Sequence, residues 1–404
     1  MGPTALFDKS FIQSLSIDES VWFNHFYVNN ICPLFYIETM ADLSKKMRNG
    51  RTAEDVVGNI ANKTPESGTP NTFHLDICRA NLYGSRVPMA GQILIPYRKP
   101  VSNDGKVGVL IEETPENTAL IRWQNRQFEE VERITAKNWR NKVAYTELGV
   151  LKEKLKYLPE DYKKLKTLEE ISKFVDDFLM NKNHAMKHAH LVEELQQIDK
   201  SDMSNIVARW IYLGQKPIME YAPYSAFVLK VDLIFILAMY KGIISDQRPS
   251  NGVDVDYLKY LPFCSVFVSQ DKIHKMLFPF LKREKQQFLW GIDLKISLKL
   301  VNEYFMGYPE EIKEKGIYCF ATQPPVGFDN LVADSWEVFM GKKLYRGKQD
   351  LHFPKKNEKL ANMMDGFTPI DESMINSENL DFISIQKKIN KRKGSWYILP
   401  VDID

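Results

Sequence analysis

The sequence predicts an α/β fold built on a parallel sheet, and two apolar stretches at opposite ends of the chain carry this prediction. Residues 264–269 form an apolar run rich in β-branched and aromatic side chains. Such a run is typical of a strand that is buried on both faces, as in parallel sheets. Residues 4–7 form a second short apolar run. Asp271 follows the first run closely and Asp8 follows the second directly, and ligands of open α/β sheets bind at the carboxyl ends of the strands.

The composition indicates a globular chain of two or three domains. The 404 residues are 44% hydrophobic and 26% charged, and the formal net charge is +2. This charge is too small to identify a nucleic-acid binder, so any basic surface must be local. The four cysteines are scattered without metal-like pairing, and no basic-then-apolar leader opens the chain. We therefore expect reduced thiols and a cytoplasmic location.

Residues 222–244 form the most apolar window of the sequence. Lys230 and Asp232 stand in its middle, where charges would be costly inside a bilayer. We expect a buried core helix and no membrane span.

Two further carboxylates occupy informative positions between these ends. Residues 31–37 are a strand candidate that contains Pro33, and residues 39–47 continue as a helix, so Glu38 is expected where a strand ends and a helix begins. Asp254 is expected at the start of a helix that crosses back to the strand at 264–269. Asp256 is an open alternative to Asp254, because the sequence does not separate the two.

Asp8, Glu38, Asp254 and Asp271 therefore stand where an α/β sheet would bring them together. Clustered carboxylates repel one another unless a divalent cation is bound, and oxygen-only ligands favour Mg²⁺ or Mn²⁺ over zinc. Such a site activates water and neutralises charge on a phosphodiester. Each residue taken singly has an alternative role as the cap of the next helix.

These residues resemble the PIN domain, and in particular its larger bacterial PIN-like branch. The resemblance rests on Asp8 with Ser10, on Glu38 after Pro33, and most specifically on the block 254–271, which contains Tyr-Leu-Pro-Phe-Cys and ends in Ser-Gln-Asp. It implies a three-layer α/β/α sandwich and metal-dependent cleavage of RNA, less often DNA. It also implies that Asp8, Glu38, Asp254 and Asp271 are the metal ligands, with Ser10 in support.

The resemblance covers only part of the chain, which sets the expected domain organisation. We expect a discontinuous core of residues 1–62 and 203–305. Residues 63–202 are predicted to form an inserted α+β module, with a β-hairpin in 91–121 and helices in 128–198. Residues 306–404 are predicted to be a C-terminal extension of irregular structure.

Other side chains are candidates for supporting roles. Around the metal ligands we expect support from residues that neighbour them in sequence or begin the next helix, namely Asp256, Lys272 and Asp293. We expect substrate contacts from basic or histidine side chains, namely Arg248, His274, Lys387 and Lys388.

The sequence thus predicts a metal-dependent endoribonuclease whose partner is nucleic acid, RNA rather than DNA. Two alternatives stay open. One is a catalytically silent PIN scaffold, in which the insertion binds a regulatory partner or a second copy of the chain. The other is a nuclease that cleaves DNA with the same metal site.

Overall fold

The computed structural model describes residues 2–46, 50–66, 68–96, 98–325, 329–341, 366–371, 380–385 and 389–401. Its centre is a five-stranded sheet in the order β3-β2-β1-β6-β7, and each pair of neighbours is parallel. These strands are β1 (Thr4–Phe7), β2 (Val28–Ile31), β3 (Thr69–Pro70), β6 (Val266–Ser269) and β7 (Gln287–Trp290). The predicted α/β fold with a central parallel sheet is confirmed. Because the chain returns from β3 to the far side of β1, the strand order reverses between β1 and β6.

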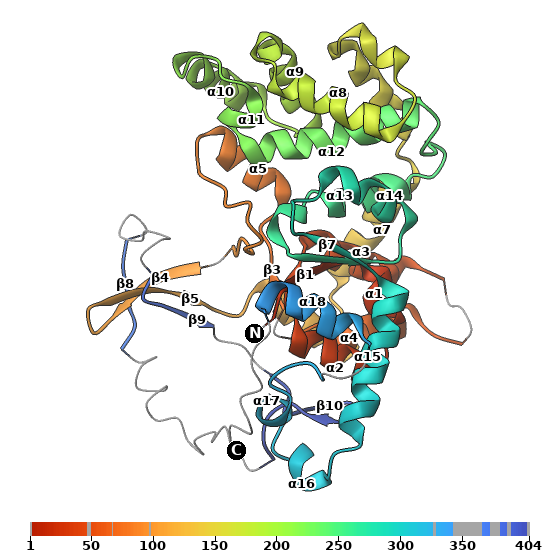
Figure 1. Ribbon diagram of the computed structural model, residues 1–404, viewed down its shortest axis with the longest axis vertical. Coiled ribbons are helices and arrows are strands. Elements are labelled where there is room, and N and C mark those ends of the chain that lie inside the picture. Colours follow the sequence, from red (N-terminus) through yellow and green to blue (C-terminus); the bar gives the residue numbers. More distant parts are fainter. Residues whose placement is uncertain are drawn as a thin grey trace.

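Helices lie on both sides of this sheet (Figure 1). Those on one side follow β1, β2 and β7: α1 (Lys9–Ser14), α2 (Ile17–Phe26), α3 (Pro33–Ala41), α4 (Ala53–Lys63) and α15 (Gly291–Met306). On the other side α13 (Ser250–Leu258) leads into β6 through the short 3-10 helix η5 (Leu261–Phe263), and α14 (Lys272–Leu281) follows β6. Short β–α connections of this kind place each helix N-terminus at the carboxyl edge of the sheet.

The core explains why the two apolar runs form the central strands. Leu6, Phe7, Phe267 and Val268 are fully buried. The Phe7 ring packs edge-on against Phe23 of α2 at 5.6 Å between ring centroids. A strand buried on both faces needs apolar side chains at successive positions, which is the pattern that both runs carry.

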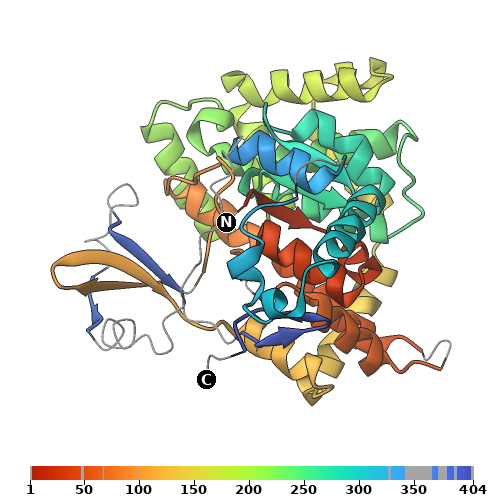
Figure 2. The same cartoon turned by 60° about the horizontal axis from the view of Figure 1, so that its bottom comes forward.

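The β-hairpin predicted within residues 91–121 is present. β4 (Arg98–Asn103) and β5 (Lys106–Ile111) pair antiparallel across the dipeptide Asp104-Gly105, whose two φ angles are 49° and 75°. Positive φ at both positions is the turn geometry that suits a two-residue hairpin, and glycine adopts it at little cost. The hairpin continues into a four-stranded sheet, β8-β4-β5-β9, with β8 (Thr368–Pro369) and β9 (Phe382–Ile385). This sheet stands beside the rest of the molecule in both views (Figures 1 and 2).

Two boundaries differ from the sequence prediction. β3 is part of the central sheet although residues 69–70 fall in the predicted insertion, because a two-residue strand is too short to show a periodic pattern. The hairpin of the predicted insertion and strands β8 and β9 of the predicted extension share one sheet, so these two regions are structurally joined.

The helices that surround α12 (Pro223–Tyr240) lie at the top of Figure 1, and we call them the helical module. From the predicted insertion they include α5 (His74–Leu82), the 3-10 helices η2 (Leu148–Tyr157), η3 (Glu160–Lys164) and η4 (Lys182–His184), α8 (Leu168–Met180) and α9 (Ala185–Leu195). α10 (Lys200–Tyr212) crosses the predicted boundary at residue 202, and α11 (Ile218–Tyr221) falls in the predicted core. Two other helices of the insertion, α6 (Pro115–Gln124) and α7 (Glu130–Ala144), pack instead against α4 and α3. Among the described helices α12 alone is long and apolar enough to cross a membrane, but 72% of it is buried in the protein. Its two charges are paired, Lys230 with Asp176 and Asp232 with Lys259. These features are those of the predicted core helix.

The C-terminal extension is more regular than predicted. It contains α16 (Glu310–Lys313), α17 (Ile317–Phe320), α18 (Leu331–Met340) and the small hairpin β10 (Arg392–Lys393) and β11 (Trp396–Tyr397). Trp396 is fully buried and packs edge-on against Trp22 of α2. The extension is therefore anchored to the core by large side chains that sequence periodicity does not reveal in such short elements.

Candidate active site

Asp8 lies at the end of β1, beside the point where the strand order reverses. Its Oδ1 accepts a hydrogen bond from the Phe11 backbone N–H at 2.8 Å. Asp8 therefore caps α1, which is the alternative role that the sequence left open. Its Oδ2 accepts the Ser10 hydroxyl at 2.8 Å and the Ser269 hydroxyl at 2.7 Å. Asp8 is 5% exposed, so these bonds hold a carboxylate that water scarcely reaches. The contact expected between Ser10 and Asp8 is present, and a supporting role for Ser10 at a metal site stays a prediction.

The end of β6 brings Asp271 to the same place. The backbone N–H of Asp271 donates to Ser269 Oγ at 2.9 Å, and that same oxygen donates to Asp8 Oδ2. Asp271 Oδ1 accepts the Ile273 N–H at 2.6 Å and so caps α14. One hydroxyl group therefore ties the two aspartates together although they are far apart in sequence.

Glu38 joins the site from a different element than predicted. The strand expected at residues 31–37 is wrong: β2 ends at Ile31, and Pro33 opens α3, in which Glu38 occupies the second turn. Proline favours the first position of a helix, where no N–H is required, and this outweighs the apolar run. Burial raises the pKa of Glu38, as do the charges of Asp8 and Asp42, against the lowering effects of Lys9 and of a hydrogen bond from Tyr257.

Asp254 on α13 completes the set. Its pKa is raised to about 8, chiefly by burial and then by the charges of Asp271, Glu38 and Asp8, against the lowering effect of Arg248. Coulomb effects of this kind require the four carboxylates to lie close together. Among the described residues Asp254 Oδ2 is buried without a hydrogen-bond partner. A buried carboxylate oxygen without a donor is a site at which a cation would replace the missing interaction.

The structure separates Asp254 from Asp256. Asp256 forms an ion pair with Lys259 at 2.8 Å, and Lys259 also binds Asp232 of α12 at 2.9 Å. Asp256 thus joins α13 to α12, on the side away from the other carboxylates. Asp254 is the member of the pair that belongs to the site.

His274 is not placed to touch substrate, contrary to the prediction. It is 1% exposed, with Nδ1 2.7 Å from Ser269 Oγ and Nε2 donating to the backbone carbonyl of Asp254. Since a carbonyl only accepts, Nε2 carries a proton. The ring instead joins the end of β6 to α13 and fixes the positions of the aspartates that those elements carry.

The remaining predicted residues have mixed outcomes. Arg248 and Lys272 are exposed near Asp254 and Asp271, and the Arg248 Nε donates to Ser250 Oγ at 2.9 Å.

Asp293 is exposed in the first turn of α15, whose cap position is Trp290. Among the described residues no hydrogen bond or ion pair joins Asp293 to the four carboxylates. Lys387 and Lys388 lie outside the described residues. Lys393 of the same basic run is buried and paired with Glu66, so it is not a free cation.

Sequence reasoning missed the polar residues that organise the site. Tyr257 donates to Glu38 Oε2 at 2.6 Å, and Lys9 Nζ donates to the Glu38 carbonyl at 3.1 Å and to Asp42 Oδ1 at 3.2 Å. Asp42 is 1% exposed and also pairs with Lys45 at 2.6 Å. Tyr257 lies one helical turn after Asp254, and this spacing is a signal that a search around each ligand would have found.

The donor set fits a hard divalent cation. All four candidate side chains offer oxygen, and Mg²⁺ and Mn²⁺ prefer such ligands. Within the described ranges, however, no three His, Cys, Asp or Glu side chains already form a group that could hold a metal ion. The carboxylates are near enough to perturb one another, and closing around a cation requires rotation of side chains.

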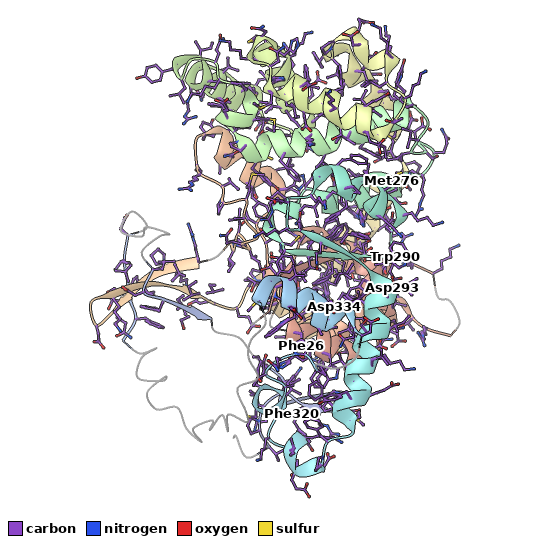
Figure 3. All side chains as sticks on the ribbon, in the orientation of Figure 1. Phe26, Met276, Trp290, Asp293, Phe320 and Asp334 are labelled. Carbon is purple, nitrogen blue, oxygen red and sulfur yellow. The ribbon has the colours of Figure 1, made fainter. Side chains whose placement is uncertain are left out.

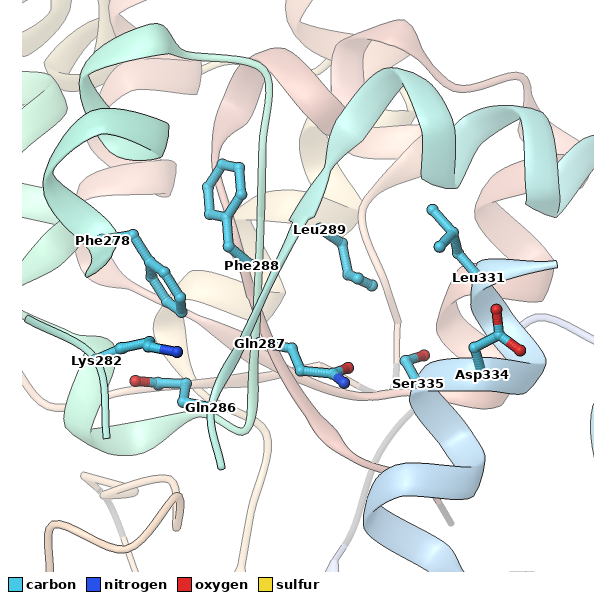
Figure 4. A pocket seen from close by; sticks show the side chains of 9 residues that line it. All are labelled: Phe278, Lys282, Gln286, Gln287, Phe288, Leu289, Leu331, Asp334 and Ser335. Atoms are coloured by element: carbon cyan, nitrogen blue, oxygen red, sulfur yellow. The ribbon is translucent and has the colours of Figure 1, made fainter. Parts of the chain in front are cut away.

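A pocket of the described residues lies away from the carboxylates. It measures about 320 Å³ and lies at the outer edge of β7, between α14 and α18 (Figure 4). Phe278 and Lys282 line it on the α14 side, and Leu331 and Asp334 on the α18 side.

No family model, no curated protein and no solved structure matches this chain.

Proposed function

We propose that this protein is a PIN-like, metal-dependent nuclease. The observation that supports this most is that the Ser269 hydroxyl ties Asp8 to Asp271 at the carboxyl edge of a parallel sheet. Glu38 and the partly buried Asp254 lie near enough for the charges of Asp271, Glu38 and Asp8 to act on Asp254 and raise its pKa. An acidic cluster at the strand-order reversal is where an open α/β sheet binds its ligand. Asp8 and Asp271 also cap helices, but capping does not account for Glu38 and Asp254, and the mutual repulsion of four carboxylates is relieved when a divalent cation binds among them.

In this proposal Asp8, Glu38, Asp254 and Asp271 hold Mg²⁺ or Mn²⁺. The metal supplies an activated water and neutralises charge on the scissile phosphate. The residues around it orient the ligands: Ser10 and Ser269 fix Asp8, Tyr257 fixes Glu38, and His274 holds α13 against the end of β6. Arg248 and Lys272, exposed beside the acidic group, are proposed to receive phosphate oxygens.

RNA is the proposed substrate, and DNA is an alternative that uses the same metal chemistry. The test is incubation of purified protein with labelled single- and double-stranded RNA and DNA, in Mn²⁺ and in chelator. We expect cleavage in Mn²⁺ alone, and its loss in Asp8→Asn and Asp271→Asn. Asp256→Asn is the matched control, because it removes a carboxylate of the same region that faces Lys259. Undiminished cleavage by both site variants would overturn the proposal.

A second candidate is a silent PIN scaffold that binds a partner through the helical module. Two observations favour it: the described residues hold no preformed metal-binding group, and both oxygens of Asp8 are already hydrogen-bonded. Absence of cleavage of all four nucleic acids, together with absence of Mn²⁺ binding, would select this candidate.

A further inference from the structure

Beside the four carboxylates, α14 and β7 form a surface of which the site proposed above uses only Lys272. Lys272 and Lys275 are exposed on α14 at positions i and i+3, and Lys282, the residue that directly follows this helix, is exposed as well. At 100° per residue Lys272 and Lys275 lie about 60° apart, so they share one helix face. In the described part of the chain none of the three forms an ion pair. They are therefore available to a negatively charged ligand.

Aromatic side chains lie beside these lysines. Phe288 and Trp290 alternate along β7 and so project from the same face of the sheet, toward α14. The Lys275 ammonium lies 5.2 Å from the Trp290 ring centroid, and Trp290 is only partly buried. Trp290 is labelled in Figure 3, where it lies between the Met276 label of α14 and the Asp293 label of α15 in this view. We call Lys272, Lys275, Lys282, Phe288 and Trp290 the α14–β7 strip.

The strip leads to the carboxylates. Trp290 is the register partner of Ser269, the residue whose hydroxyl ties Asp8 to Asp271. Neighbouring strands are about 4.8 Å apart, so the tryptophan stands one strand away from the acidic group. Among the described strands β7 has a partner on one side only. Its outer edge carries no further described strand, and α18 lies beside the end of β7 at which Gln287 stands.

The pocket of Figure 4 lies at the other end of β7. Gln287, about 10 Å from Trp290 at the usual rise of a strand, lines the pocket with Phe278 and Phe288. Its Oε1 is buried and has no hydrogen-bond donor among the described residues. Lys282 borders the pocket on the α14 side, whereas Asp334 borders it on the α18 side. The pocket thus combines aromatic side chains, a hydrogen-bond acceptor without a donor among the described residues, and a lysine on one side.

We propose that single-stranded nucleic acid lies along the α14–β7 strip, with its phosphates on the lysines, one base on Trp290 and another in the pocket at Gln287. This inference rests on the function proposed above and assigns its substrate class. Bases stack on aromatic side chains when they are unpaired, while lysines follow the backbone. A duplex keeps its base faces inside and cannot use Trp290 in this way. The free Gln287 oxygen accepts from an exocyclic amino group.

The test measures binding of fluorescently labelled 12-nucleotide RNA and DNA by anisotropy, in chelator, so that it does not depend on cleavage. We expect Trp290→Ala to weaken single-strand binding about tenfold, the equivalent of about 1.4 kcal/mol, and Trp290→Phe to retain most of it. Tyr212→Ala is the matched control, because this tyrosine is 87% exposed on α10, in the helical module. Lys275→Gln and Lys282→Gln should each reduce the slope of log affinity against log salt by about 0.7. Lys299→Gln, on the exposed face of α15, should leave it unchanged.

The possible outcomes distinguish a failure of the proposed binding surface from a failure of the proposed nuclease function. If Trp290→Ala binds single strands with wild-type affinity, or if the protein binds duplex and single strand equally well, nucleic acid does not bind along the α14–β7 strip. This conclusion holds even if Asp8→Asn abolishes cleavage. If single strands bind in a way that depends on Trp290, but no preparation cleaves them in Mn²⁺, the binding surface is supported and the nuclease function is overturned. Binding of an acidic peptide in preference to both nucleic acids overturns the inference as well.

Discussion

The Tyr257 hydroxyl donates a 2.6 Å hydrogen bond to the Glu38 carboxylate across 219 residues of sequence. This bond joins α13 to α3 and so connects Asp254, one turn before Tyr257, with the glutamate of a distant helix. The pKa of Glu38 is raised chiefly by burial, and the Tyr257 bond opposes that rise. The tyrosine thus favours the charged form of Glu38, which is the form that a metal requires.

Tyr257→Phe tests this role. Without the hydroxyl the Glu38 pKa should rise further, so Mn²⁺ affinity at pH 7 should fall by about tenfold, within the range found for residues that orient metal ligands. Isothermal titration measures the affinity. Tyr224→Phe is the control, because Tyr224 is equally buried but donates to the Lys259 carbonyl. If both variants bind Mn²⁺ alike, the bond between Tyr257 and Glu38 has no part in the site.

The pH dependence of stability tests the crowding around Asp254. Its folded pKa, about 8, exceeds its ordinary value of 3.8, so the folded state holds a proton that the unfolded state has lost. In metal-free protein, the free energy of unfolding should therefore decrease as the pH rises from about 4 to about 8, by up to about 1.4 kcal/mol per pH unit. Asp254→Asn cannot ionise and should lack this contribution. Urea denaturation at several pH values measures the difference between variant and wild type. A difference that does not change with pH would contradict the crowding.

Asp256→Asn separates the two aspartates of α13. It should leave Mn²⁺ affinity unchanged and lower the free energy of unfolding by about 2 kcal/mol, because the buried Lys259 loses one of its two partners. Asp254→Asn should show the reverse pattern, with weaker Mn²⁺ binding and no loss of metal-free stability. Mn²⁺ titration and thermal unfolding of both proteins, side by side, decide the assignment. The opposite result would make Asp256 the ligand.

Ser269→Ala removes the hydroxyl that links Asp8 to Asp271 and touches His274. Since side chains that hydrogen-bond to metal ligands hold those ligands in position, Mn²⁺ affinity should fall 10- to 100-fold. Ser297→Ala is a suitable control, as Ser297 is also buried but accepts the Leu331 N–H away from the site. Equal affinities in these two variants would show that Ser269 serves the fold alone.

The sequence predicted the two central strands, β1 and β6, because their evidence is local, whereas β3 and β7 were not predicted. Residues 4–7 and 264–269 carry the unbroken apolar pattern of strands buried on both faces, and an aspartate follows each. Glu38 was expected after a strand because residues 31–37 are apolar, yet Pro33 begins a helix there. Glu38 nevertheless lies near Asp8 and accepts a hydrogen bond from Tyr257, because α3 brings it there in place of the predicted strand.

The partners of the carboxylates could not be predicted, because they depend on tertiary contacts. Whether Asp254 or Asp256 faces the site is decided by Lys259 and Asp232, which lie on two different helices. His274 was expected at the substrate, but its burial follows from the packing of α14 against α13. The joining of the β-hairpin to β8 and β9 is a non-local pairing of the same kind.

The most direct test of the central claim is anomalous diffraction at the manganese edge from crystals of the wild-type protein soaked in Mn²⁺. We predict a peak among Asp8, Glu38, Asp254 and Asp271, at about 2.1 to 2.2 Å from at least two of their carboxylate oxygens. The unpartnered Oδ2 of Asp254 should be one of them. Absence of a peak among these four residues at saturating Mn²⁺ would contradict the account.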